Sequence, residues 1–321
     1  MTFDTTKSCS QTHCYPEDTG CQMGDGLYEC PHFKRNEDDK TETPVVLSGG
    51  EGVPWTGGAF GLDDMAWLAS RQRPLLYAPI GAHNVGKTTF LASLYIGLCR
   101  GVLPAKHEFI GSFTFGGWEK LAAYVRHAPD GIGPGFPPHT PVTENRLPGW
   151  LHFGFRATDD RVRDVLLADT PGEWFSRWAV HAESEGAVGA RWVARHADGF
   201  LFFVDSDGLI GPDRRNVVEK TELLAERLSG VLAGRPMVIV WAKSDREILP
   251  QIRSDVETAL KKALPHAESF QTSVHSAPTK TEPTRPFWNP IEWLLLRESL
   301  VSPLPIAAPI DATNPFLAFR G

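Results

Sequence analysis

The sequence predicts an α/β fold of three layers, in which helices cover both faces of a mostly parallel sheet with one antiparallel edge strand. From Pro74 onwards, short apolar segments alternate with amphipathic ones, which is typical of strand-helix-strand units. Two of the apolar segments are joined by Ala157-Thr158-Asp159-Asp160, which is short enough for a hairpin and so predicts an antiparallel pair. A glycine-bearing segment, residues 81–88, lies between the first apolar segment and the first amphipathic one, where a strand turns into a helix.

The elements follow from these patterns in order along the chain. Strands are expected where the apolar segments are short, at residues 75–79, 150–156, 164–168, 199–205, 237–242 and 268–272. Helices are expected where the amphipathic pattern is longer, at residues 87–100, 118–127, 187–195, 214–232 and 245–264. Residues 128–149 are rich in Pro and Gly, which favours an exposed loop.

Composition divides the chain into four expected parts. Residues 1–45 are polar and contain four cysteines, and residues 46–70 form a glycine-rich linker with a short helix at 62–70. Residues 71–278 hold the alternating pattern of the α/β domain. Residues 279–321 are a Pro-rich extension with a short helix at 291–297.

Charge and hydropathy exclude some function classes. The 321 residues carry a net charge of −7, with a pI near 5.9, which argues against a general nucleic-acid binder. No apolar run approaches the roughly 18 residues that a bilayer-spanning helix needs. The first residues lack the charged-then-apolar pattern of a secretory signal, so we expect a cytoplasmic protein.

The strongest motif is Gly81-Ala82-His83-Asn84-Val85-Gly86-Lys87-Thr88, which fits the phosphate-binding pattern G-x-x-x-x-G-K-[ST]. Its glycines allow the backbone N–H groups to wrap a phosphate at the start of a helix. Lys87 would reach the β- and γ-phosphate oxygens, and the Thr88 hydroxyl would ligate Mg²⁺. The motif specifies the fold as a P-loop NTPase sandwich, and the expected nucleotide-binding residues here are Gly81, His83, Asn84, Val85, Gly86, Lys87, Thr88 and Thr89.

A second motif, Asp169-Thr170-Pro171-Gly172, follows the expected strand 164–168. Ligands of open α/β sheets bind at the carboxyl ends of strands, so Asp169 would hold Mg²⁺ through a water molecule. The N–H group of Gly172 would meet the γ-phosphate. Alone, the tetrapeptide is also an ordinary turn sequence, and it is its place after the first motif that indicates a metal site.

A third strand end carries Ala242-Lys243-Ser244-Asp245, and here the chain resembles the translation-factor-related (TRAFAC) class of P-loop GTPases over about residues 74–276. The guanine motif of that class is [NT]-K-x-D, and the resemblance implies that Asp245 accepts the guanine N1 and N2 hydrogens while the Lys243 stem covers the base. Adenine lacks those donors and would be rejected. Ala242 departs from the pattern, so an ATPase of the same fold remains the alternative.

The segment Thr272-Ser273-Val274-His275 resembles the T-S-A-K motif of the same class. The resemblance implies that the backbone at Ser273 and Val274 contacts the guanine O6. Asn84 and the D-T-P-G sequence also resemble the Era and tRNA-modification GTPases, several of which coordinate K⁺ through that Asn. The alternative is that Asn84 only accommodates an unusual loop conformation.

The moving parts are expected in two segments. The resemblance places the first switch before strand 150–156, where Thr140 or Thr143 would close on Mg²⁺ and the γ-phosphate; Thr143 is nearer the strand and is preferred. Glu173 occupies the position of the water-orienting Gln of Ras-like proteins, as a base, an arginine partner or a bystander, and we expect slow intrinsic hydrolysis. The catalytic set is thus Lys87, Thr143 and Glu173.

Residues that follow Glu173 carry two further expectations. Trp174, Phe175 and Trp178 either repack between nucleotide states and present an apolar surface to a protein effector, or are plain core residues. Arg177 and Arg191 are candidate transition-state partners, but surface roles are favoured for both.

The N-terminal cysteines have the spacing Cys9-x4-Cys14-x6-Cys21-x8-Cys30. Four thiolates are enough for a tetrahedral Zn²⁺ site, although neither half has the tight C-x2-C spacing of common zinc ribbons. The alternative is a tail whose reduced cysteines bind nothing.

Together these features predict a GTP-binding and GTP-hydrolysing switch with GTP and GDP as ligands. The chain also resembles bacterial GTPases of the double-GTPase kind in its sequence from Gly81 to Tyr95 and from Asp169 to Glu173. Those GTPases are proposed to act in conflict systems against phage. A nucleotide-gated interaction module with negligible turnover is the remaining alternative. The oligomeric state is left open.

Overall fold

A computed structural model describes residues 58–61, 64, 68–69, 72–126, 149–275 and 284–297. All of them belong to the unit Pro54–Gly321, whereas the unit Met1–Val53 lies outside the described residues. The expected cysteine site at Cys9, Cys14, Cys21 and Cys30 and the first-switch residues Thr140 and Thr143 therefore fall outside the described part of the chain.

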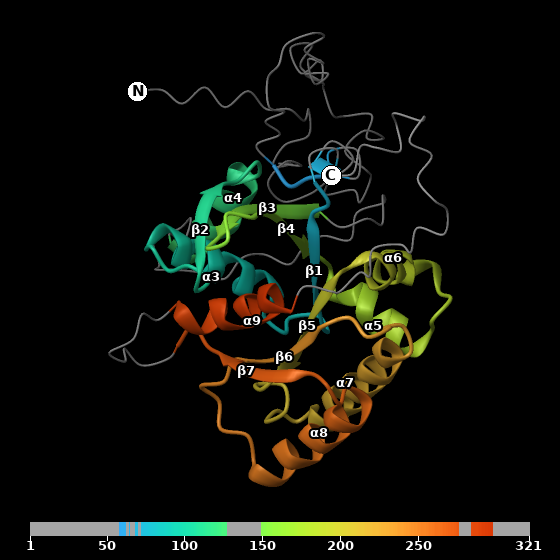
Figure 1. The fold of residues 1–321 in the computed structure, drawn as a ribbon. Helices are drawn as coiled ribbons and strands as arrows, with labels where there is room; N and C mark the ends of the chain where they lie inside the picture. The colour runs from blue at the N-terminus through green and yellow to red at the C-terminus, as the bar shows by residue number, and fades with distance from the viewer. Residues whose placement is uncertain are drawn as a thin grey trace, which may run out of the picture. The chain divides into compact units, whose positions relative to one another are not determined.

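The domain is built on a seven-stranded sheet with the order β2-β3-β4-β1-β5-β6-β7 (Figure 1). β3 pairs antiparallel with both β2 and β4, and the remaining neighbours pair in parallel. The strands are β1 (Leu75–Ile80), β2 (His107–Gly111), β3 (Gly149–Ala157), β4 (Val162–Asp169), β5 (Gly199–Asp205), β6 (Met237–Ala242) and β7 (Glu268–Thr272). The predicted P-loop fold and its hairpin are confirmed.

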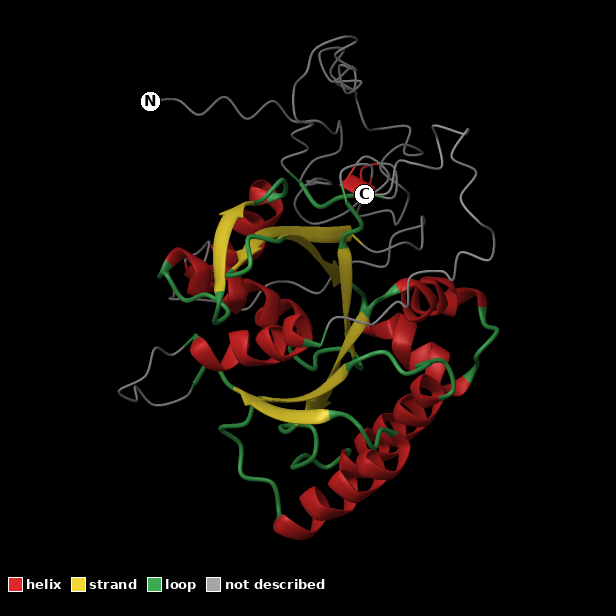
Figure 2. Ribbon diagram, viewed as in Figure 1, coloured by secondary structure: helices red, strands yellow, loops and turns green. Residues whose placement is uncertain are grey.

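Helices cover both faces of the sheet (Figure 2). One face carries α3 (Lys87–Cys99), α4 (Phe115–Arg126) and α9 (Arg285–Leu296), and the other carries α5 (Gly172–Val180), α6 (Val188–His196), α7 (Arg214–Ser229) and α8 (Pro250–Ala263), with a short 3₁₀ turn at Glu185–Ala187. Alternate residues of a strand face opposite layers: Phe200 packs under the second group of helices, and Leu201 under the first. This burial on both sides explains why the central strands are almost wholly apolar.

The limits of three segments differ from the sequence predictions. Phe60 forms a bridge with Trp150 and is buried, so residues predicted as linker contribute to the core. α9 begins at Arg285, before the expected start, and packs on α3 and β6, so it belongs to the domain rather than to an extension. α8 begins at Pro250, since proline suits the first turn of a helix, and residues 245–249 are a loop.

Two elements were not predicted at all. β2 pairs with β3 as an additional edge strand, and α5 begins at Gly172, the last residue of the D-T-P-G motif. Within the described ranges, no helix combines the length and the hydropathy needed to cross a bilayer.

Candidate functional site

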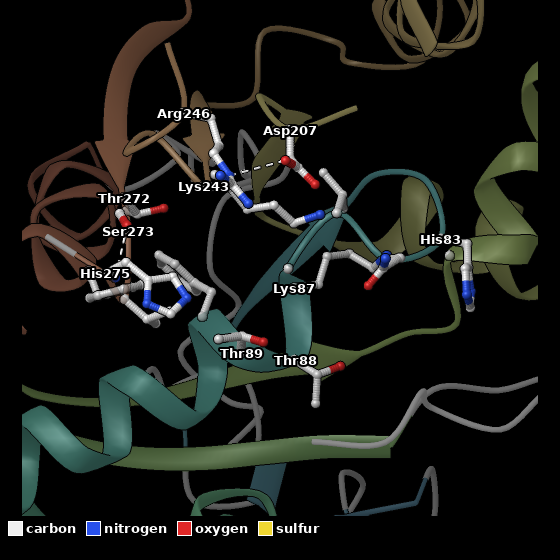
Figure 3. A pocket seen from close by; sticks show the side chains of 18 of the residues that line it. His83, Lys87, Thr88, Thr89, Asp207, Lys243, Arg246, Thr272, Ser273 and His275 are labelled. Carbon is white, nitrogen blue, oxygen red and sulfur yellow. Dashed lines mark hydrogen bonds and ion pairs between the residues drawn. The ribbon is translucent and has the colours of Figure 1, made fainter. Parts of the chain in front are cut away.

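The four sequence motifs meet around one cavity of about 470 Å³ at the carboxyl ends of β1, β4, β6 and β7. It is lined by residues 83–90, 170–173, 242–243, 245–246 and 272–275, together with Asp207 and Phe287. Figure 3 shows His83 and Lys87 toward one end of it and Ser273 and His275 toward the other. The two ends are described in turn, as the phosphate-loop end and the base-motif end.

The phosphate loop takes a backbone conformation that its sequence permits. Asn84 has φ +60° and Gly86 has φ +101°, both in the left-handed region. α3 begins after Gly86 with no side-chain cap and no acidic residue in its first turn. Gly86 has no side chain that could cap this helix N-terminus, and an anion-binding helix end has the same arrangement.

Lys87 is buried against the loop that precedes it. Its Nζ donates to the carbonyl oxygens of Gly81, at 3.0 Å, and Ala82, at 2.9 Å. Burial lowers the pKa of Lys87 to about 8, against the opposing effect of the Asp169 and Glu173 carboxylates. The ammonium group is held where an incoming anion would exchange for the two carbonyl oxygens.

A hydroxyl and a carboxylate converge beside Lys87. Thr88 Oγ1 lies 3.4 Å from Asp169 Oδ1, so the phosphate loop and the D-T-P-G motif meet as predicted. Oxygen donors of this kind suit Mg²⁺, which usually takes one or two protein ligands together with substrate phosphates and water. Among the described residues, no group of three or more His, Cys, Asp and Glu side chains is arranged to hold a metal by itself.

The D-T-P-G turn is packed directly on the phosphate loop. Thr170 Oγ1 donates to the Pro79 carbonyl at 3.0 Å. A Cβ atom added to Gly172 would lie 2.4 Å from the His83 nitrogen and 2.5 Å from the Ala82 carbonyl oxygen. Glycine is therefore the residue that allows the two backbones this approach.

Glu173 faces a residue that sequence analysis assigned only to nucleotide binding. His83 Nδ1 lies 2.6 Å from Glu173 Oε1. The contact joins two motifs that are far apart in sequence, and no local sequence pattern predicts it.

At the base-motif end, the two C-terminal motifs are joined through one hydroxyl group. Ser273 Oγ donates to Asp245 Oδ1 at 2.5 Å, and it accepts the N–H group of His275 at 3.0 Å. The hydrogen bond from Ser273 is the main cause that lowers the pKa of the Asp245 carboxyl below its usual value. Asp245 is thus kept ionised and acceptor-only.

Lys243 and Ala242 differ in how they are held. Lys243 has φ +55°, and its Nζ lies 3.0 Å from Oδ1 of Asp205, the last residue of β5. Ala242 presents only a methyl group toward the phosphate loop, 3.6 Å from where a Cβ on Gly86 would stand. An Asn or Thr at this place would offer a hydrogen bond that Ala242 lacks.

Several cavity residues were missed by sequence analysis. Arg246 Nε lies 3.2 Å from Asp207 Oδ1, and Phe287 also lines the cavity, as does His275, which sequence analysis named only as part of the T-S-V-H segment. The position of Asp205 at a strand end is the same signal that identified Asp169. Phe287 comes from α9, a segment that the sequence assigned to an extension.

Burial and contacts describe the residues that follow Glu173. Trp174, Phe175 and Trp178 are buried in the core beneath α5. Arg191 Nη1 donates to the carbonyl oxygens of Ala182 and Ser184, so it holds the loop after α5. Neither Arg177 nor Arg191 lines the cavity.

Comparisons with known proteins give one family match. The family model described as Double-GTPase 2 matches residues 78–294, about two thirds of the chain. No curated protein matches. Among solved structures, the crystal structure of a mutation variant of SsGBP is similar, with 16% identity and a TM-score of 0.37; the match covers 72% of this chain and 58% of that chain. At that TM-score the likeness supports no argument about this chain.

Proposed function

The chain belongs to the Double-GTPase 2 family, and from this premise we propose that it is a molecular switch that binds GTP with Mg²⁺ and hydrolyses it to GDP and phosphate. The observation that carries the proposal is the meeting of all four motifs around one 470 Å³ cavity. Separate chance matches to the motifs would have no reason to share a cavity.

The phosphate-loop end would hold the triphosphate. N–H groups at the start of α3 and the Lys87 ammonium would bind the β- and γ-phosphates. Thr88 and Asp169 would hold Mg²⁺, and Thr143 would close on the ion from the first switch. When bound, Mg²⁺ neutralises charge that develops on the phosphate oxygens.

Hydrolysis would proceed by in-line attack of water on the γ-phosphorus. The bond from that phosphorus to the bridging oxygen breaks, and GDP leaves with the bonding electron pair. Lys87 and the Gly172 N–H group would stabilise charge on the transferring group, and Glu173 would orient the water. The proposal includes a slow intrinsic rate, because a carboxylate beside a γ-phosphate repels it and a facing imidazole offsets only part of that repulsion.

The base-motif end would select guanine. Asp245 would accept the N1 and N2 hydrogens, the Lys243 stem would cover the ring, and the backbone at Ser273 and Val274 would contact O6. Adenine offers no matching pair of donors, so it would leave the Asp245 carboxylate unpaired. Switch-dependent binding of a protein effector, and a role in bacterial defence against phage, belong to the proposal through the family resemblance alone.

The experiment combines titration calorimetry with a single-turnover assay on the full chain and Mg²⁺. We expect GDP to bind at least about tenfold more tightly than ADP and bound GTP to be hydrolysed slowly. Equal affinities would indicate an ATPase of the same fold. GTP that stays intact for hours would indicate a nucleotide-gated interaction module. No uptake of either nucleotide would refute the proposal.

A further inference from the structure

The contact between His83 and Glu173 lies at the phosphate-loop end of the candidate site. Nδ1 of His83 and Oε1 of Glu173 are 2.6 Å apart, and the side chains are 45% and 34% exposed. Both residues line the cavity, together with Lys87 and Gly172. The pair therefore bridges the phosphate loop and the first turn of α5.

Backbone packing holds the pair together, in addition to the contact of the side chains. Gly172 approaches the backbone of Ala82 and His83 so closely that a Cβ atom has no room. The two residues that follow Glu173, Trp174 and Phe175, are buried in the core and anchor this turn of α5. The backbone is therefore fixed on both sides of Glu173, which limits the positions that its carboxylate can take. His83 lies within reach of that carboxylate.

The carboxylate also lies near the group that would bind the terminal phosphates. Glu173 is one of the two acids whose charge acts on the buried Lys87 ammonium. The negative charge of a carboxylate in that place would be repelled by a bound triphosphate if no positive or hydrogen-bonding group faced the carboxylate. An imidazole that faces one carboxylate oxygen offsets part of that repulsion and fixes the carboxylate plane.

We propose that His83 is a positioning residue for hydrolysis: it binds Oε1 of Glu173 and so aims the second carboxylate oxygen at the attacking water. The proposal rests on the function proposed above. Glu173 is the group that touches the water, and His83 acts only through Glu173. This role is additional to any contact of the phosphate loop with the nucleotide.

The water oxygen forms a bond to the γ-phosphorus while the bond from that phosphorus to the bridging oxygen breaks, and the electron pair stays with GDP. The proton released from the water passes to Glu173 and from there to the departing phosphate. Holding Glu173 in one orientation lowers the cost of ordering the water, which is how a positioning residue contributes to rate.

The test is single-turnover GTP hydrolysis by the full chain in five forms beside the wild type: His83→Ala, His83→Gln, Glu173→Gln, the double variant His83→Ala/Glu173→Gln, and His266→Ala. His266 is an exposed histidine in the turn between α8 and β7, away from the cavity, and serves as the matched control. GDP affinity and the melting temperature are measured for each form. GDP lacks the γ-phosphate, so its affinity reports on folding and loop integrity.

We expect Glu173→Gln to lower the rate about 10²-fold and His83→Ala about tenfold, with GDP affinity changed less than about threefold. His83→Gln should recover part of the rate, because its amide N–H group can still donate to Glu173. In the Glu173→Gln background, His83→Ala should cost nothing further. His266→Ala should match the wild type.

Three results would overturn the proposal while leaving GTP hydrolysis established. His83→Ala and His83→Gln keep the full rate; the two losses add in the double variant; or the His83 variants hydrolyse faster, which would make the contact a lock on the switch. A wild type that binds GTP and never hydrolyses it would instead refute the proposed enzymatic function, and the role of His83 with it.

Discussion

The two ends of the cavity differ in the chemical groups that form them: mainly backbone groups at one end and side chains at the other. At the phosphate-loop end, the important groups are backbone N–H groups at the start of α3, a lysine buried against two carbonyl oxygens, and a glycine packed on the loop. At the base-motif end, the important groups are side chains held by other side chains, Asp245 by Ser273 and Lys243 by Asp205.

This difference explains why the phosphate-binding motif matches its pattern in full, whereas the guanine motif departs from its pattern at Ala242. A backbone-made site depends on φ angles and close approaches that few residues permit, as at Gly86 and Gly172. A side-chain-made site tolerates replacement when a neighbour supplies the lost support. Ser273 and Asp205 fix Asp245 and Lys243 although Ala242 contributes no hydrogen-bonding side chain. Substitutions at the phosphate-loop end should therefore lower the rate of hydrolysis, whereas substitutions at the base-motif end should lower the affinity for GDP.

The largest effect is expected from Gly172→Ala. The new methyl group would lie 2.4 Å from the His83 nitrogen, so the backbone of α5 must retreat from the phosphate loop. We expect single-turnover hydrolysis to fall on the order of 10³-fold, because the Gly172 N–H group and Glu173 both lose their positions. GDP and ADP affinities should change little, and in equal proportion.

The control for this change is Gly230→Ala at the end of α7. Gly230 has φ −66°, and a Cβ atom there would lie at an ordinary 3.6 Å from the Arg227 carbonyl oxygen. A rate for Gly172→Ala that equals the rate for Gly230→Ala would show that the close packing of the two backbones has no part in hydrolysis.

Asp245→Asn probes the other end. An amide cannot accept both guanine hydrogens as the carboxylate does, so we expect GDP affinity to fall about 10²-fold. ADP affinity should stay the same, which would remove most of the discrimination. Calorimetry with both nucleotides measures this, with the exposed Asp255→Asn on α8 as the control. Equal losses for GDP and ADP would contradict a base-selective role.

Ser273→Ala should have a smaller effect of the same kind. Without the hydroxyl, Asp245 loses the hydrogen bond that keeps its pKa low, and the N–H group of His275 loses its acceptor. We expect GDP affinity to fall about tenfold, as is usual for a hydrogen bond to a charged group, with ADP affinity unchanged. Ser269→Ala on the exposed side of β7 is the matched control. A loss below twofold would show that Asp245 needs no support from Ser273.

The same contrast between backbone and side chains separates what the sequence predicted from what it did not. The P-loop fold and the places of the motifs followed from strand ends and from glycines that local geometry requires. β2 was missed because its five residues, His-Glu-Phe-Ile-Gly, show neither an apolar run nor an apolar-polar alternation, and its pairing comes from β3. α5 was missed because Pro-Gly is a common turn sequence, whereas here Pro171 is the N-cap of a helix and Gly172 is its first residue.

Side-chain pairing between distant segments was the part that no local pattern encoded. The facing of His83 and Glu173, and of Lys243 and Asp205, depends on how strand ends are arranged in the sheet. Sequence analysis named three of these four residues for other reasons and found none of the pairings. The residue roles at both ends remain predictions for the variants above.

The smallest effect is a pH dependence that should appear at the phosphate-loop end alone. Lys87 has a pKa of about 8 in the free protein, because burial disfavours its charged form. Bound phosphates favour the ammonium form, so binding takes up a proton wherever the free lysine is neutral. Affinity is then at its full value below pH 8 and falls as pH rises. From about pH 7 to about pH 8.5 the fall should be about fourfold.

Titration of GDP in two buffers with different ionisation enthalpies measures the proton uptake directly. Lys87→Arg is the matched variant, because an arginine stays charged over the whole range and should bind without taking up a proton at this site. Any contribution from ionisation of the nucleotide is common to both proteins and cancels in the comparison. Equal uptake by the two would show that Lys87 is already fully charged in the free protein, and that the two carbonyl oxygens and the nearby acids compensate for its burial.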